Sequence, residues 1–262
     1  MSDRRGRLRI LLLDHGRQSL PFLRSLKRAG HHISVACGDK LSTAYFSRYG
    51  DRKLLWANYF HDPETFTRQL LDYARRTRPD VTLAVGDVSA GILARNKPAL
   101  SQCTRLTVPD LEVFDVAADK ARTMAFCMDH DIPCPQTYFP ENDEQWEQVL
   151  AKVPFPVMVK PRRGLGAVGL HRFEAPGELR QHARALEQRY GPLLVQEFIP
   201  QQGGTQFQAE AFLDAESRMK VCMVIAKPRF FPVTGGTSTA NVTIDRPDIQ
   251  ESVRRLLEGI GW

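Results

Sequence analysis

FPVMVKPRRGLGAVGLHRF, residues 155–173, places a G-x-G-x-x-G string directly after an apolar strand pattern; its glycines are Gly164, Gly166 and Gly169. In a dinucleotide-binding fold such a string lies between a strand and a helix. Here a second strand pattern follows the glycines, so a dinucleotide site is not supported. A glycine-rich hairpin lets backbone N–H groups approach phosphate oxygens without a clash with Cβ atoms. Lys160 ends the first strand and adds a positive charge there. The stretch predicts a phosphate site; the alternative is an exposed hairpin with Lys160 in solvent.

A second informative segment follows at LLVQEFIP, residues 193–200. A strand that ends in an acid, two apolar residues and a proline is a suitable hinge between two lobes. Its backbone can bind the edge of an adenine base while Phe198 or Ile199 packs on the ring. By itself this segment is an ordinary strand end. It indicates a nucleotide site only because it follows the glycine hairpin and Lys160.

The two halves of the chain show different patterns. In the first half, buried strand patterns alternate with amphipathic helix patterns, which is typical of a parallel, doubly wound sheet. After about residue 109, strand patterns cluster with short links, which indicates antiparallel hairpins. The first half predicts strands at 8–13, 32–36, 53–55 and 81–85 and helices at 18–29, 63–76 and 88–96. The second half predicts helices at 110–129, 141–151 and 177–189 and strands at 157–160, 168–173, 193–198, 206–213 and 218–225. The fold class is therefore α/β followed by α+β, with domains at 1–109 and 110–262.

Composition narrows the class of protein. The 262 residues are 42% hydrophobic and 25% charged, as in soluble globular proteins, and no apolar run is long enough to span a membrane. The net charge is +6, but basic residues are spread along the chain and mixed with acids, which favours solvated faces over a nucleic-acid groove. The five cysteines form no C-x-x-C pair, which argues against a disulfide framework and a zinc site. We expect a cytoplasmic protein with no nucleic-acid or membrane partner, and a homo-oligomer is compatible with the sequence.

A further candidate site is KPRFFPVTGGTST, residues 227–239. Its Gly/Thr/Ser loop offers N–H and hydroxyl donors to an anion. We assign it to an acceptor carboxylate or to a γ-phosphate; the alternative is a polar surface turn. The residues concerned are Lys227, Arg229, Gly235, Gly236 and Thr237.

Lys120, then VMVKP with its glycine hairpin, then LVQEFI occur in an order and spacing that resemble the ATP-grasp superfamily. The closest resemblance is to carbamoyl-phosphate-synthase-like carboxylate–amine ligases, and it covers essentially the whole chain. It implies a Rossmann-like pre-ATP-grasp domain over 1–109 and an ATP-grasp domain over 110–262. Within the latter it implies a small lobe at about 119–197 and the start of a second lobe at 198–262.

The resemblance also implies residue roles. Lys120 and Lys160 would bind the phosphates of ATP, with Gly164, Gly166 and Gly169 as the flap over them. The hinge would hold adenine through four residues, Gln196, Glu197, Phe198 and Ile199. The implied activity is ATP-dependent ligation of a small-molecule carboxylate to an amine through an acylphosphate.

This chain departs from the family pattern at two places. The position where the family has an acid for the ribose hydroxyls is Gln206 or Gln208 here, with Glu210 near. The family's magnesium ligands lie near the C-terminus, and we expect them beyond Trp262, which would leave this chain inactive by itself. The acids Asp245, Asp248 and Glu251 are expected to cap a helix instead.

The sequence bears on two other classes of protein. A protein-kinase-like fold needs its lysine after the glycines and later H-R-D and D-F-G motifs, and the sequence has none of these. A non-catalytic nucleotide-binding module remains the alternative to a ligase.

Overall fold

The computed structural model describes residues 6–164, 168–200, 206–231 and 237–262, although the side chain of Thr237 is not included. The chain divides into two compact units, unit 1 at Met1–Phe114 and unit 2 at Asp115–Trp262. The domain boundary predicted after residue 109 falls just ahead of a helix, α6 (Leu111–Ala118), inside which the two units divide. No helix among the described residues is long and apolar enough to cross a membrane.

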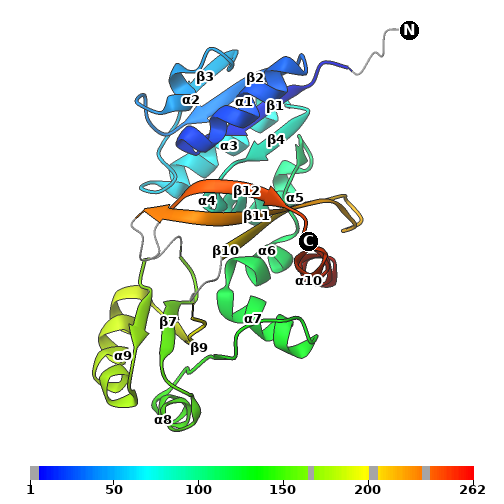
Figure 1. Cartoon of the computed structure of the whole chain (residues 1–262). Coiled ribbons are helices and arrows are strands. Elements are labelled where there is room, and N and C mark those ends of the chain that lie inside the picture. The colour runs from blue at the N-terminus through cyan, green and yellow to red at the C-terminus, as the bar shows by residue number, and fades with distance from the viewer. Residues whose placement is uncertain (1–5, 165–167, 201–205, 232–236) are drawn as a thin grey trace. The chain divides into compact units, whose positions relative to one another are not determined.

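Unit 1 is built on a parallel five-stranded sheet with the order β3-β2-β1-β4-β5 (Figure 1, blue to cyan). This confirms the predicted α/β class. The central strand β1 is buried from Ile10 to Leu13 because helices cover both faces of the sheet. The strands are β1 (Arg9–Leu13), β2 (His32–Cys37), β3 (Arg52–Leu55), β4 (Val81–Ala84) and β5 (Arg105–Leu106).

Alternate residues of β1 pack against helices on opposite faces of this sheet. Leu11 and Leu13 join a core with Phe66 of α3, whereas Leu12 packs with Leu23 of α1. Asp62 caps α3, since its side chain accepts a hydrogen bond from Thr65 N–H. The helices of unit 1 are η1 (Gly16–Gln18, a 3-10 turn), α1 (Ser19–Arg28), α2 (Thr43–Phe46), α3 (Pro63–Thr77), α4 (Asp87–Arg95) and α5 (Lys97–Leu100).

Unit 2 contains a four-stranded antiparallel sheet with the order β6-β9-β7-β8. Val157, Val159 and Val195 bury one face of this sheet against two helices, α8 and α9. The elements are α7 (Lys120–Asp129), β6 (Thr137–Tyr138), α8 (Asp143–Lys152), β7 (Val157–Pro161), β8 (His171–Phe173), α9 (Pro176–Tyr190) and β9 (Leu193–Glu197).

The rest of unit 2 is an antiparallel sheet of β10 (Gln206–Leu213), β11 (Met219–Phe231) and β12 (Thr237–Ile244), followed by α10 (Pro247–Gly259) (Figure 1, orange to red). Two expectations were wrong here. The strand predicted at 218–225 continues to Phe231, and β12 was not predicted. Thr, Ser and Asn dominate β12, so its sequence has a turn-like composition that hydrogen bonding to β11 overrides.

The prediction of a single helix over 110–129 was also wrong in one respect. It is two helices, α6 and α7, because Asp119 adopts an extended backbone between them and caps the second. The break places Lys120 at the first position of α7.

Candidate functional site

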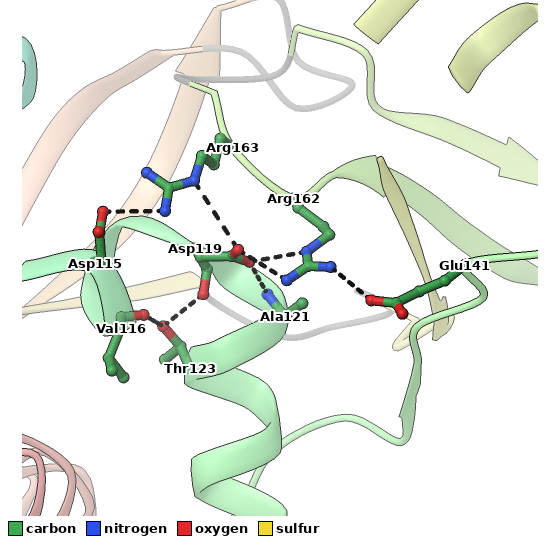
Figure 2. A network of polar contacts seen from close by, with 8 residues as sticks. All are labelled: Asp115, Val116, Asp119, Ala121, Thr123, Glu141, Arg162 and Arg163. Atoms are coloured by element: carbon green, nitrogen blue, oxygen red, sulfur yellow. Dashed lines mark hydrogen bonds and ion pairs between the residues drawn. The ribbon is translucent and has the colours of Figure 1, made fainter. Parts of the chain in front are cut away.

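Asp119 is the central residue of a polar network that holds α7 beside the glycine hairpin (Figure 2). Its side chain is buried and accepts hydrogen bonds from Ala121 N–H at 2.9 Å and from Arg162 Nε and Nη2 at 3.2 and 3.0 Å. Arg162 also reaches Glu141 Oε1 at 3.3 Å, and Arg163 Nη2 lies 3.0 Å from Asp115 Oδ1. Burial tends to raise the pKa of Asp119, but Arg162 and the helix N–H groups lower it below its ordinary value.

This network places Lys120 beside the glycines. The Lys120 N–H donates to Arg162 C=O at 2.9 Å, and Lys120 Nζ donates to Gly164 C=O at 3.1 Å. Two of the predicted phosphate-binding residues are therefore in direct contact, although they are far apart in the sequence. The structure pairs both Arg162 and Arg163 with acids.

Lys160 lies on β7 and points to the same face of the sheet as Gln196 of β9. Its Nζ donates to Gln196 Oε1 at 2.5 Å, and Gln196 Nε2 donates to Thr137 Oγ1 at 2.9 Å. Burial, followed by the positive charge of Lys120, lowers the pKa of Lys160. Among the described residues no carboxylate forms an ion pair with Lys160. The site thus holds a half-buried ammonium group whose hydrogen-bond partner among the described residues is a neutral amide.

The glycines of the hairpin are required for different structural reasons. Gly164 has φ +143° and open space around it, so it is needed for backbone conformation. Gly169 has φ +72°, and a Cβ there would lie 2.5 Å from Cγ of Pro161, so it is needed for conformation and for space. Gly166 lies outside the described residues.

The hinge after β9 is held by two hydrogen bonds to Gln136. Glu197 N–H donates to Gln136 C=O at 3.0 Å, and Gln136 N–H donates to Glu197 Oε1 at 2.9 Å. Phe198 N–H donates to Pro156 C=O at 3.3 Å. Within the described parts of the chain, Ile199 N–H donates to no acceptor. Sequence reasoning missed Gln136, because only the pairing of β6 with β9 brings these residues together.

The side chains of the hinge differ in accessibility. The Arg172 guanidinium carbon lies 4.0 Å from the centre of the Phe198 ring, so one face of that ring is covered. Ile199 is 59% exposed. Arg172 was not predicted as part of the site, although its place on β8, opposite Met158 of β7, puts it on the same face as Lys160.

The remaining predicted residues lie on the second sheet of unit 2. Gln206 is the register partner of Lys227, so the structure brings a predicted ribose contact beside a predicted anion contact. Arg229 lies opposite Ala240. The predicted strand ends at 225, ahead of both cations, and this end was wrong because β11 continues through both.

The rest of the predicted anion loop is only partly described. Gly235 and Gly236 lie outside the described residues, and Thr237 begins β12. Gln208 Nε2 donates to Glu210 Oε1 at 2.8 Å on the neighbouring strand β10.

The acids before and within α10 have local partners. Asp248 pairs with Arg246 and Glu251 with Arg254, and Gln250 Nε2 lies 3.5 Å from Asp245 Oδ1. Asp248 also lies in the first turn of α10, where an acid is favourable. Among the residues described, no group of three or more His, Cys, Asp or Glu side chains could hold a metal ion.

Comparison with known proteins identifies the second unit. Residues 117–210 match the family model of the RimK-like ATP-grasp domain. A comparison with curated proteins finds no match. Among solved structures, 98% of this chain superposes on 61% of an L-amino acid ligase from Bacillus licheniformis, with a TM-score of 0.71 and 16% identity.

Two other solved structures show the same fold. The biotin carboxylase domain of the Hydrogenobacter thermophilus 2-oxoglutarate carboxylase, a dimer in complex with MgADP, ADP and bicarbonate, matches with a TM-score of 0.77 and 15% identity; 98% of this chain covers 59% of that one. An N5-carboxyaminoimidazole ribonucleotide synthetase from Thermotoga maritima matches with a TM-score of 0.63 and 15% identity, over 96% of this chain and 62% of the other. The chain thus spans about 60% of the length of these structures. The domain match and the shared fold confirm the resemblance seen in the sequence: this chain carries an ATP-grasp domain.

Proposed function

We propose that unit 2 binds ATP against the glycine hairpin and the 195–199 hinge. The observation that carries this proposal is the half-buried Lys160 ammonium, which donates to the neutral Gln196 side chain and whose pKa is lowered by burial and by Lys120. A positive group held in this way gains stability when an anion enters, because the anion replaces lost solvation. Triphosphate oxygens supply that charge.

The hinge supports the adenine end of this proposal. The N–H groups of Glu197 and Phe198 already bond within the protein, so we assign the donor for the adenine edge to Ile199 N–H. Its exposed side chain would pack on the base, and Arg172 would keep the Phe198 ring in place. The ribose contact is assigned to Gln206, with Lys227 beside it.

We further propose that the whole protein ligates a carboxylate to an amine, as in carbamoyl-phosphate-synthase-like enzymes. The γ-phosphoryl group would pass to the carboxylate, and the amine would displace phosphate from the resulting acylphosphate. Lys120 and Lys160 would neutralise phosphate charge, which is the main task of a protein in phosphoryl transfer. Lys227, Arg229, Gly235, Gly236 and Thr237 are the proposed contacts of the acceptor carboxylate.

Magnesium is expected for this chemistry, but the described acids do not fit a magnesium site, so no step is assigned to it. We propose the cytoplasm as the location, since all five cysteines are free thiols. Self-association is a further proposal, supported by the dimeric relative and tested by sedimentation.

The test compares Lys160→Ala with Arg163→Ala in calorimetric titrations with ATP and ADP. Arg163 is half exposed and paired with Asp115, so it is a matched loss of one positive charge next to the same hairpin. Losing a charge-assisted contact at a half-buried site costs about 1.5–3 kcal/mol, against less than about 1 kcal/mol at an exposed one. Equal losses would mean that the phosphates do not bind at Lys160. Tight nucleotide binding by the whole protein without ADP release in the presence of carboxylates, amines and magnesium would favour the non-catalytic module.

A further inference from the structure

A pocket of about 290 Å³ opens in unit 1 where three neighbouring strands, β1, β2 and β3, reach their carboxyl ends. We propose that this pocket binds a small organic amine in its ammonium form. In parallel sheets this edge is where ligands bind, because the loops that follow the strands converge there. The residues that carry the argument are Asp14, His15, Asp39, Asn58, Tyr59 and Phe60.

The inner wall of the pocket contains a buried carboxylate, Asp14, which is 7% exposed. Its oxygens accept hydrogen bonds from Ser19 Oγ, at 2.6 Å, and from Ser42 Oγ. These two hydroxyls and the buried Cys37 thiol, which also hydrogen-bonds to Asp14, are neutral donors, and among the described residues no lysine or arginine forms an ion pair with Asp14. A carboxylate has about four acceptor sites, so Asp14 can accept a further hydrogen bond. Asp14 therefore offers a negative charge and free acceptor capacity to a ligand.

The neighbouring His15 ring is held in one orientation. Tyr59 Oη–H donates to Asp14 C=O at 2.9 Å, so the contact of 3.0 Å between Tyr59 Oη and His15 Nδ1 is one in which Nδ1–H donates. Nε2 is then the ring nitrogen available to a ligand. Gly86 packs on the ring so closely that a Cβ would lie 2.5 Å from Nδ1. This fixed ring indicates a built site rather than a surface hollow.

The charge in the pocket has one sign. Burial, together with the charge of Asp14, raises the pKa of Tyr59 to about 12, so that hydroxyl stays neutral. Asp39 adds a second carboxylate at the rim, and the lining contains no lysine or arginine among the described residues. The protein has a net charge of +6, so a pocket with two acids and no cation is set apart from the rest of the chain. Such a pocket attracts cations and repels free carboxylates.

The size and shape of the pocket narrow the choice of cation further. At about 30 Å³ for each water-sized group, the volume holds a molecule of about ten non-hydrogen atoms. The described chain has no group of three or more metal-ligating side chains, which favours an ammonium over a metal ion. At the mouth, Phe60 is 53% exposed and its ring lies 4.6 Å from that of Tyr59, which offers aromatic surface to an aliphatic stem or a cation. The inferred ligand is a small amine with an apolar part and no carboxylate. This inference does not depend on nucleotide binding in unit 2.

The test is an NMR titration of the full chain, following the backbone amides of residues 14–16, 38–42 and 58–60. Three probes are compared near neutral pH: butylamine, 1-butanol, which lacks the charge, and norvaline, which adds an α-carboxylate to the same carbon chain. Butylamine should shift these amides with saturation, at an affinity about tenfold or more above that of either analogue. Equal affinity for the three probes, or no saturable shift at these amides, overturns the proposal.

Variants of the two carboxylates test which negative charge is responsible for the binding of butylamine. Asp14→Asn should lower butylamine affinity about tenfold or more, because the charge is buried. Asp39→Asn should lower it about two- to fivefold, because the rim is exposed and screened, and Asn retains the side-chain oxygen that accepts from Leu41 N–H. Asp72→Asn removes an exposed acid of α3 in the same unit and should have no effect. If Asp14→Asn does not fold, Asp39→Asn and Phe60→Ala carry the test. Affinities equal to that of Asp72→Asn in every folded pocket variant contradict the proposal.

Discussion

Replacing Asp119 tests whether one buried carboxylate joins α7 to the glycine hairpin. Asp119→Asn removes the charge that holds Arg162 but retains an oxygen that can cap α7. Asp119→Ala removes both the charge and the cap. Comparing the two variants therefore separates the ion pair from the helix cap.

The magnitude follows from burial. The Asp119 side chain is 8% exposed and that of Arg162 is 23% exposed. Removing one partner of a fully buried pair costs about 3–5 kcal/mol. Arg162 keeps a second acid, Glu141, at 3.3 Å and some contact with solvent, so we expect about 2–3 kcal/mol for Asp119→Asn. Loss of the cap adds about 1 kcal/mol in Asp119→Ala.

Urea unfolding followed by tryptophan fluorescence measures these free energies. The chain has three tryptophans, and in a Trp56→Phe background the two that remain, Trp146 and Trp262, both belong to unit 2. Glu147→Gln is the control, because Glu147 and its partner Arg180 are each 59% exposed. That variant should cost less than about 1 kcal/mol.

The pH dependence gives an independent check on the same pair. Burial tends to raise the pKa of Asp119, and Arg162 with the α7 N–H groups lowers it overall. A depressed pKa means that the stabilisation is complete above the unfolded-state value of about 3.9 and is lost as the pH falls through the folded-state value. Asp119→Asn should therefore lose less stability than the parent below about pH 4. If Asp119→Asn and Glu147→Gln destabilise unit 2 equally, and their acid profiles match that of the parent, the network does not hold the site.

Two further predictions concern the proposed phosphate site. Burial and the charge of Lys120 lower the pKa of Lys160, so the affinity for ATP should fall as the pH rises through a window below the ordinary lysine pKa of 10.5. Lys160→Arg keeps its charge and should therefore flatten this pH profile in calorimetric titrations. Among the glycines, Gly169→Ala should destabilise unit 2 by more than about 2 kcal/mol in urea unfolding, because the new Cβ meets Pro161. Gly164→Ala brings backbone strain but no clash, and it should cost about 1–2 kcal/mol. Gly177 lies in the first turn of α9 with open space around it, so Gly177→Ala should be neutral or stabilising by up to about 1 kcal/mol. Equal effects at Gly169 and Gly177 would contradict the packing described for the hairpin.

Local patterns predicted the elements well where periodicity and side-chain chemistry agree. The apolar run within residues 8–13 predicted a buried strand, and the structure makes it the central strand of a parallel sheet, where both faces are covered. The glycine string between two strand patterns predicted a hairpin and excluded a dinucleotide fingerprint. Patterns failed at β12, where polar residues form a strand because a partner strand supplies their hydrogen bonds.

The sequence by itself determined the two-part architecture and the ATP-grasp resemblance, and it led to the prediction that Lys120, Lys160 and the glycines bind phosphate, because these depend on order, spacing and residue type along the chain. Tertiary structure alone decided which partners these groups have. The pairing of Arg162 with Asp119, the support of Glu197 by Gln136 and the pocket around Asp14 each join residues from separate strands, helices or loops. The energies of such contacts depend on distance and burial, and neither quantity exists until the sheets have formed and brought distant residues together.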